Sequence, residues 1–430
     1  MRYHSTKQDK IFSPLSEAVI KGLPDDNGLF VPESIATLPR TLFDPKHGIG
    51  LEEWGMAVMK PYFTPDIPES VLQTIIEDTL NFSIPLIEVE RNVYSLELFH
   101  GPTLAFKDVG ARFMARVLNY LSSRSKERTI VLVATSGDTG SAVAHGFFDM
   151  DNIEVVILYP SGKVSPLQEQ QMTTLGKNIH ALEVAGNFDD CQRMVKEAFL
   201  DQALNKKLQL TSANSINIAR FLPQSVYYFH ALAQLGFPEN AVISVPSGNY
   251  GNLTAGLTGY LMGMPVEKFV ASSNVNDIVP HYLATGEFSI KPSISTISNA
   301  MDVGNPSNFS RIDHFFKHDL EKMRRIMAGF SFDDDSTRAA IKEVYQSFDY
   351  MLDPHGAVAY LGLKKYMDKH PGKTGIFLET AHPAKFKDTV EEVLNTKLEI
   401  PEQLSVGMNK PKQTTLIGSN FSELKDFLLR

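Results

Sequence analysis

The chain has 430 residues, a length that predicts two or three domains of roughly 150 residues each. Hydrophobic residues make up 43% and charged residues 21%, values typical of a folded globular protein, which excludes disordered, collagen-like and coiled-coil chains. The net charge is −9 and no run rich in Lys or Arg is present, which argues against binding to nucleic acid or to an anionic membrane by bulk electrostatics.

The single cysteine and the lack of long apolar segments indicate in which cellular compartment the protein works. Cys191 is the only cysteine, so no intrachain disulfide and no thiolate metal cluster can form, which suits a reducing environment. The first ten residues are polar, and no run approaches the roughly 20 apolar residues of a membrane span. We therefore expect a cytoplasmic protein with no membrane partner.

The N-terminal part of the chain has a helical pattern. Apolar residues recur at spacings of three and four in Glu52–Met59 and in Ser70–Leu80. We expect residues 1–85 to form a mainly helical appendage.

After Pro85, short β-branched apolar runs alternate with amphipathic stretches, a pattern typical of βαβ units and a parallel sheet. Small polar loops follow each run, and ligands of open α/β sheets bind beyond the carboxyl ends of the strands. The predicted strands are Thr129–Ala134, Ile153–Tyr159, Ala241–Val245, Lys268–Ala271 and Gly375–Leu378.

The sequence offers two candidate domain boundaries, the Pro-flanked segment near Phe82–Pro85 and the linker Thr211–Asn217, whose small polar residues could join two α/β halves. We expect a large domain from 86–120 and 215–400, and a small domain from 121–214. The tail, 401–430, is predicted to be helical, with a last helix over Asn420–Arg430 that Ser422 caps.

Several common functional motifs are absent. The sequence has no GxGxxG after a strand, no GxxxxGK[ST], no HExxH and no GxSxG. His314 and His318 are four residues apart, which would put both rings on one helical face, as a metal pair or as a pair of surface histidines. Because further ligands are not apparent, we expect no metal.

Two glycine-containing loops each follow a predicted strand and precede a helical pattern. In Ser247–Asn252, Gly248 and Gly251 would allow positive φ and close approach of an anion, and Asn249 and Asn252 would supply amide donors. A plain βα turn with capping asparagines is the alternative. Thr135–Gly140 has the same placement with added hydroxyl groups, so two loops suggest two anionic groups.

Lys107 follows a strand-like run, Tyr94–Leu98, and starts an amphipathic helix over Val109–Leu121. A lysine in a buried loop beside Leu104 and Phe106 would lose hydration, which favours the neutral amine and attack on a carbonyl carbon. A solvated surface charge is the alternative.

Taken together, these segments resemble the threonine synthase family, which are pyridoxal-phosphate enzymes of the tryptophan synthase β-like (fold type II) superfamily. The resemblance implies two open twisted-sheet α/β domains with pyridoxal 5′-phosphate in the cleft between them, plus the N-terminal appendage. The matching segments are Ser16–Glu33, Glu97–Asp108, Ala134–Phe147, Ile157–Gln171, Ser212–Gln224, Ser244–Asn252, Ser298–Asn308 and Glu379–Asp388.

The resemblance also implies roles for single residues. Lys107 is similar to the lysine that forms the Schiff base with the cofactor, and Thr380 to the hydroxyl residue that faces the pyridine nitrogen. The loop similar to the one that cradles the cofactor phosphate consists of Gly248, Asn249, Tyr250, Gly251 and Asn252. The loop with Asp138 is similar to the one that receives the substrate carboxylate.

The implied reaction converts O-phospho-L-homoserine and water to L-threonine and phosphate. Lys107 would remove the α-proton, the γ-phosphate would leave and water would add at the β-carbon. Candidate substrate ligands are Ser136, Asp138, Thr139, Lys163, Asn217 and Arg220. The alternatives are a phospho-lyase that forms 2-oxobutyrate and ammonia, a non-catalytic binding protein on the same fold, and a Schiff-base enzyme without cofactor. A monomer or homodimer is expected.

Overall fold

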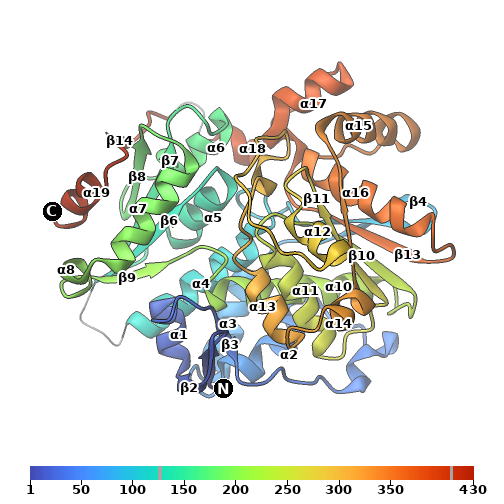
Figure 1. Cartoon of the computed structure of the whole chain (residues 1–430), viewed down its shortest axis with the longest axis horizontal. Coiled ribbons are helices and arrows are strands. Elements are labelled where there is room, and N and C mark those ends of the chain that lie inside the picture. Colours follow the sequence, from blue (N-terminus) through green and yellow to red (C-terminus); the bar gives the residue numbers. More distant parts are fainter. Residues whose placement is uncertain (124–127, 407–409) are drawn as a thin grey trace.

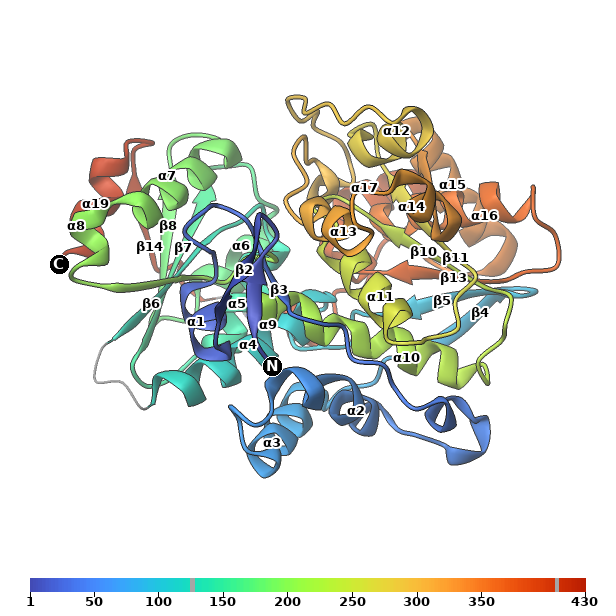
Figure 2. The same cartoon turned by 60° about the horizontal axis from the view of Figure 1, so that its bottom comes forward.

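The computed structural model describes residues 1–123, 128–406 and 410–430, and their strands form three sheets. Two open sheets, one of six strands and one of five, lie side by side with helices on both faces (Figures 1 and 2). This arrangement confirms the expected pair of α/β units. A smaller sheet of three strands and several helices lie below them, at the N-terminal end of the chain.

The six-stranded sheet carries the larger unit. Its strands are parallel except for β4, which pairs antiparallel with β5. Their order is β12 (Met327–Ser331), β11 (Lys268–Ser273), β10 (Ala241–Pro246), β13 (Thr374–Glu379), β5 (Val93–Glu97) and β4 (Leu86–Glu90). The associated α-helices are α10 (Ser225–Gln234), α11 (Gly251–Leu261), α12 (Ile278–Thr285), α13 (Phe309–Phe315), α14 (Leu320–Ile326), α15 (Asp334–Phe348), α16 (Pro354–Met367), α17 (Lys387–Leu394) and α18 (Glu402–Ser405), with 3-10 turns η4 (Asn299–Met301) and η5 (Pro383–Phe386).

Side chains of this sheet alternate between two apolar layers, as successive residues of a strand must. Val242 and Val270 belong to the cluster formed with α15 and α16, whereas Ile243 and Phe269 belong to the cluster that includes α10 and α11. The inner strands β10, β11 and β13 are buried on both faces, which explains their continuous apolar runs in the sequence.

The five-stranded sheet carries the smaller unit, and all of its strands are parallel. Their order is β14 (Thr414–Ile417), β8 (Ile179–Val184), β7 (Ile153–Pro160), β6 (Thr129–Ala134) and β9 (Gln209–Ser212). The associated helices are α4 (Lys107–Ser122), α5 (Asp138–Phe147), α6 (Pro166–Thr173), α7 (Phe188–Leu200), α8 (Gln202–Asn205), α9 (Ile218–Phe221) and α19 (Phe421–Leu428), with the 3-10 turn η3 (Leu222–Gln224).

The C-terminal tail differs from the expectation of a helical segment. Its strand β14 is the edge strand beside β8, and Leu424 and Leu428 of α19 join the apolar cluster that covers this face of the sheet. Asn420, not Ser422, stands at the N-cap position of α19. The tail therefore completes the smaller unit, because its side chains bury apolar surface of α7 and β8.

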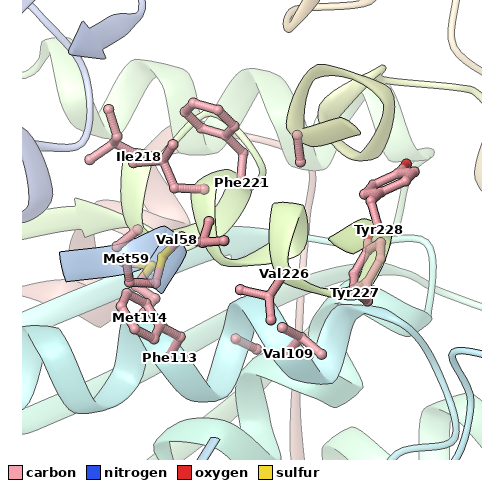
Figure 3. Packing of buried hydrophobic residues seen from close by; sticks show 14 of the residues in the cluster. Val58, Met59, Val109, Phe113, Met114, Ile218, Phe221, Val226, Tyr227 and Tyr228 are labelled. Carbon is pink, nitrogen blue, oxygen red and sulfur yellow. The ribbon is translucent and has the colours of Figure 1, made fainter. Parts of the chain in front are cut away.

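Helix α4 follows β5 of the six-stranded sheet and leads to β6 of the five-stranded sheet, and it packs against the N-terminal part and α9 (Figure 3). Val109, Phe113 and Met114 of α4 lie in one buried cluster with Val58 and Met59 of the N-terminal part and with Ile218 and Phe221 of α9. Because α4 starts at Lys107, this packing fixes the position from which the lysine side chain emerges.

The N-terminal part is mainly helical, as expected, but it also contains the antiparallel sheet β2-β1-β3. Trp54 of α2 stacks on Phe229 of α10 with ring centroids 5.2 Å apart, which attaches this part to the larger unit. The elements are β1 (Tyr3–Ser5), β2 (Gln8–Ser13), α1 (Leu15–Lys21), β3 (Phe30–Pro32), η1 (Arg40–Phe43), η2 (Pro45–His47), α2 (Leu51–Phe63) and α3 (Glu69–Thr79). Within the described ranges, no helix is long and apolar enough to cross a membrane.

Candidate active site

Lys107 lies next to the carboxyl end of β13. The backbone N–H of Phe106 donates to the carbonyl oxygen of Thr380 at 2.9 Å, and Ala105 pairs with Ala381 in an isolated antiparallel bridge. These contacts hold the start of α4 beside the first residue after β13. The structure thus brings together two predicted site residues, Lys107 and Thr380, that are 273 positions apart in the sequence (380 − 107).

The electrostatic surroundings of Lys107 favour its neutral form. Burial lowers the pKa of Lys107; the carboxylate of Asp138 opposes this shift, and the cations Arg220 and Lys385 add to it. In the described part of the chain, its ammonium forms no hydrogen bond or close ion pair, and it lies 5.4 Å from the ring centroid of Phe106. A lysine in this state is available as a nucleophile and as a base.

The Ser247–Asn252 loop joins β10 to α11, so it lies at the positive end of that helix. The expectation of positive φ at Gly248 and Gly251 is wrong, because the left-handed residue is Tyr250, with φ of 62°. Gly248 is required by close packing instead: a Cβ at this position would lie 2.7 Å from the Cα of Met301 and 2.8 Å from the carbonyl oxygen of Ala300.

The asparagines of this loop do not act as simple helix caps. Asn249 donates to the Oγ of Ser215 at 2.9 Å and accepts from the backbone N–H of Ser307 at 2.6 Å. The Oδ1 of Asn252 accepts from the hydroxyls of Tyr227 and Tyr228, at 2.5 and 2.6 Å. The Nδ2 of Asn252 is buried without a partner in the described residues, so it is a donor available to an anion at the start of α11.

Arg311 supports this loop indirectly, through Ser215, and the sequence did not indicate this role. Its guanidinium is fully buried and donates to the carbonyl of Phe30 at 3.0 Å, the carbonyl of Ser215 at 3.3 Å, the carbonyl of Ile216, and the Oδ1 of Asn308 at 2.6 Å. Burial lowers the pKa of Arg311 to about 9. Since Ser215 binds Asn249, Arg311 is one residue removed from the loop.

A second buried network reaches the same loop from the end of β13. The backbone N–H of Asp353 donates to the Oε1 of Glu379 at 3.1 Å, and the carboxylate of Asp353 lies 2.6 Å from the Nδ1 of His355. The Nε2 of His355 accepts from the backbone N–H of Ala300 at 3.2 Å, so Nδ1 carries the proton that Asp353 accepts. This series of hydrogen bonds ends at Ala300, whose carbonyl oxygen packs against Gly248.

The Thr135–Gly140 loop joins β6 to the start of α5. The Oγ1 of Thr135 accepts from the backbone N–H groups of Gly137 and Gly140, each at 2.9 Å, so this hydroxyl organises the turn. Ser136 and Thr139 are half-buried, and Asp138 is buried. Gly137 has φ of 143° and lies under the side chain of Gln168, a position that only glycine adopts without strain.

Asp138 is paired across the two units with Lys385, which was not among the predicted site residues. The Nζ of Lys385, in η5, lies 2.6 Å from the Oδ1 of Asp138. Although burial alone would raise it, the pKa of Asp138 is held well below its usual range by Lys385 and Lys107 and by hydrogen bonds from Lys385 and Gln168.

The remaining candidates differ in how well the structure suits them to bind substrate. Arg220 is buried, burial lowers its pKa to about 10, and its Nε has no partner in the described residues, so it can receive an anion. Asn217 is fully engaged: it caps α9 through the N–H of Ala219 and donates to the carbonyls of Val19 and Ser212. Lys163 is exposed, and its charge acts on Asp190.

The histidine pair does not form the expected helical face. Helix α13 ends at Phe315, His318 has φ of 58°, and its Nδ1 pairs with the carboxylate of Asp313 at 2.5 Å. In the residues that the structure describes, no group of three or more His, Cys, Asp or Glu is arranged to hold a metal.

Comparisons with known proteins agree with this arrangement. Three family models match: "Threonine synthase N terminus" over residues 2–80, "Pyridoxal-phosphate dependent enzyme" over 73–379 and "Threonine synthase, C-terminal" over 356–428. The chain is 44% identical to the threonine synthase of Haemophilus influenzae, and the alignment covers 100% of both chains.

Solved structures give the same result. The crystal structure of threonine synthase from Escherichia coli matches with a TM-score of 0.93 and 40% identity, covering 100% of this chain and 99% of that one. The structure of threonine synthase from Brucella melitensis with bound pyridoxal phosphate matches with a TM-score of 0.92 and 33% identity, covering 100% and 98%. The chain therefore belongs to the threonine synthase family of pyridoxal-phosphate-dependent enzymes.

Proposed function

We propose that the protein converts O-phospho-L-homoserine and water to L-threonine and phosphate, with Lys107 as the catalytic residue. The observation that carries the proposal is the backbone pairing of Phe106 with Thr380, which holds Lys107 and a hydroxyl residue at the carboxyl end of β13. The neighbouring parallel strand, β10, leads into the Ser247–Asn252 loop. Family membership supports the same reaction.

The residues of the site fit pyridoxal phosphate. The unpartnered Nδ2 of Asn252 and the N-terminus of α11 suit its phosphate. The loop that carries them is tightly packed, since a side chain at position 248 would collide with the backbone of Ala300 and Met301. We assign Gly248, Asn249, Tyr250, Gly251 and Asn252 to that phosphate, Lys107 to the aldehyde carbon and Thr380 to the pyridine nitrogen. When bound, the cofactor supplies an electron sink for negative charge at the substrate α-carbon.

Lys107 would carry the proton transfers. Its lowered pKa leaves more of the amine neutral at physiological pH, so it can take the proton from the α-carbon and then one from the β-carbon. Loss of the second proton allows the bond between Cγ and the phosphate oxygen to break. The γ-carbon then takes up a proton and becomes the methyl group. Water adds its hydroxyl at the β-carbon, the remaining proton of that water goes to the released phosphate, and Lys107 returns a proton to the α-carbon.

The substrate anions would be bound by the Thr135–Gly140 loop and by Arg220. Ser136 and Thr139 offer hydroxyl donors at the start of α5, and the Nε of Arg220 is an unused buried donor. We assign Asn217 a structural role because its amide is fully engaged, and Lys163 remains a candidate only for an exposed part of the site. A cytoplasmic location and a monomeric or homodimeric state remain predictions.

A phospho-lyase that releases 2-oxobutyrate and ammonia would use the same cofactor residues. The two activities are separated by the fate of water, so the experiment is turnover of O-phospho-L-homoserine in water labelled with ¹⁸O. We expect threonine with label in its β-hydroxyl and phosphate without label, because the Cγ–O bond breaks. Unlabelled phosphate with 2-oxobutyrate would favour the lyase, and labelled phosphate would indicate a phosphatase, contradicting the proposal.

A further inference from the structure

The ion pair of Lys385 and Asp138 links the two units at the substrate side of the site. Lys385 comes from η5, after β13 of the six-stranded sheet, and Asp138 is the first residue of α5, after β6 of the five-stranded sheet. The Nζ–Oδ1 distance is 2.6 Å, and the exposed fractions of the two side chains are 0% and 5%. Removing two charges from water this completely is costly unless they compensate each other.

The groups around the pair complete its hydrogen bonding. The Nζ of Lys385 also donates to the carbonyl oxygen of Thr103 at 2.8 Å, and the Nε2 of Gln168 donates to the Oδ1 of Asp138 at 2.9 Å. Two other charged groups interact with the pair: the charge of Lys107 lowers the pKa of Asp138, and Lys385 acts on Asp108, whose carboxylate accepts from the backbone N–H and hydroxyl of Thr103. Within the described residues, Lys385 forms its ion pair with Asp138 alone.

The position of Asp138 creates an electrostatic problem that Lys385 solves. The turn at the start of α5 suits an anion, since it lies at the positive end of the helix and carries the half-buried hydroxyl residues Ser136 and Thr139. A carboxylate in the same turn would repel a carboxylate of the substrate, with an energy that grows as water is excluded. The ammonium of Lys385 cancels the charge of Asp138, and the turn is left with a net attraction for the substrate.

We propose that Lys385 is a positioning residue that neutralises Asp138 across the two units, so that the Thr135–Gly140 loop can bind the carboxylate of the substrate. This inference rests on the proposed function for the identity of the substrate. It assigns Lys385 a role in substrate affinity and not in proton transfer, because Lys385 is already engaged by Asp138 and Thr103.

The test is a cycle of variants, Lys385→Met, Asp138→Asn and the double variant, loaded with pyridoxal phosphate, with Lys387→Met as the matched control. Lys387 is two residues further on and pairs at 3.7 Å with Glu391. We expect Lys385→Met to raise KM for O-phospho-L-homoserine at least tenfold with a smaller change in kcat. The double variant should return KM to within about threefold of the parent, since an ion pair is replaced by an uncharged pair.

The decisive comparison is the effect of Lys385→Met on KM in the parent and in the Asp138→Asn background. If the single variant fails to fold, the comparison of Asp138→Asn with the double variant still tests the proposal. In the Asp138→Asn background the change is expected to be neutral or beneficial for KM. Harm of similar size in both backgrounds would overturn the proposal, as would a Lys385→Met variant with the KM of the parent. A melting temperature restored in the double variant while KM stays high would also overturn it, because the pair would then be only structural.

Failure of the proposed function gives a different result. If the parent protein forms no product from O-phospho-L-homoserine, the reaction is wrong, whatever the variants do. The charge compensation is then read from the change in cofactor absorbance on titration with L-threonine, whose carboxylate tests the same loop. The same pattern of loss and rescue is expected in that titration, and its absence would overturn the inference.

Discussion

The two polar loops of the site are built by different means. The Ser247–Asn252 loop is held within the larger unit, by close packing at Gly248 and by amide contacts that lead to Arg311. The Thr135–Gly140 loop is organised by the hydroxyl of Thr135, but the ion pair of its Asp138 is made across the two units, with Lys385. The proposed cofactor side therefore relies on packing and amide contacts, whereas the proposed substrate side depends on how the two units meet.

The largest effect on stability is expected when the support of the cofactor loop is removed. In Arg311→Lys, one ammonium replaces a guanidinium that binds three carbonyls and Asn308, so several buried acceptors lose their donor. We expect a loss of about 3 kcal/mol or more in the free energy of unfolding, with weaker cofactor binding, measured by urea unfolding and cofactor titration. Arg338→Lys, which changes an exposed arginine paired with Glu392, is the control. Equal stability of the two variants would contradict the supporting role.

A smaller effect is expected when the cofactor loop itself is altered. In Gly248→Ala the new Cβ meets backbone atoms of Ala300 and Met301, so the loop must move. Overpacking costs about 1–3 kcal/mol, and if this cost falls on the bound state it corresponds to about a fivefold to 150-fold loss of pyridoxal phosphate affinity. In Gly50→Ala the nearest atom, on Glu53, is 3.6 Å away, and cofactor affinity should be unchanged. An unchanged dissociation constant in Gly248→Ala would mean that the cofactor binds elsewhere.

The hydrogen-bonded network at the end of β13 contains two buried carboxyl groups, of which Glu379 is neutral and Asp353 is charged. Burial and the charge of Asp353 raise the pKa of Glu379 well above its usual range, while hydrogen bonds from Glu379 and His355 more than offset burial and lower the pKa of Asp353. Glu379→Gln should therefore cost less than about 1 kcal/mol, and Asp353→Asn about 1–3 kcal/mol, because donors around Asp353 lose their acceptor. Chemical unfolding of both variants measures this, and equal costs would contradict the assignment of the proton to Glu379.

The smallest expected effect concerns acid stability on the substrate side. The pKa of Asp138 is lower in the folded than in the unfolded protein, so its stabilisation is present above the unfolded value near 3.8 and is lost as the pH falls below it. The double variant of Asp138→Asn with Lys385→Met should lose this pH dependence. Unfolding curves between pH 3 and pH 7 test this; parallel pH profiles for parent and variant would contradict the charged state of the pair.

Much of the fold could be predicted because buried strands leave a local signature. The five apolar runs coincide with β6, β7, β10, β11 and β13, since strands covered on both faces are apolar throughout. The strand β14 could not be predicted, because it has four residues at an exposed edge and carries Leu416 in solvent. Its place is decided by pairing with β8, which is more than 200 residues away in the sequence.

The candidate site could be predicted only where neighbours in the chain define it. Lys107 and the Ser247–Asn252 loop became candidates from their position after a strand, and Thr380 from its resemblance to a family motif; the structure places Lys107 and Thr380 together. The positive φ of Tyr250 could not be predicted, because glycine is the residue that usually adopts this conformation and the loop offers two glycines. Lys385 and Arg311 were missed because their partners are distant in the sequence, so no local pattern marks them.

Lys107 is central to the proposed reaction, and one measurement tests its catalytic role directly. Protein loaded with pyridoxal phosphate and its Lys107→Ala variant are mixed with O-phospho-L-homoserine, and threonine, 2-oxobutyrate and phosphate are quantified. We expect threonine and phosphate in equal amounts from the parent, and at least about a thousandfold lower rate in the variant, because the base for both proton transfers is gone. Turnover by the variant at a rate near that of the parent would contradict the assignment of Lys107.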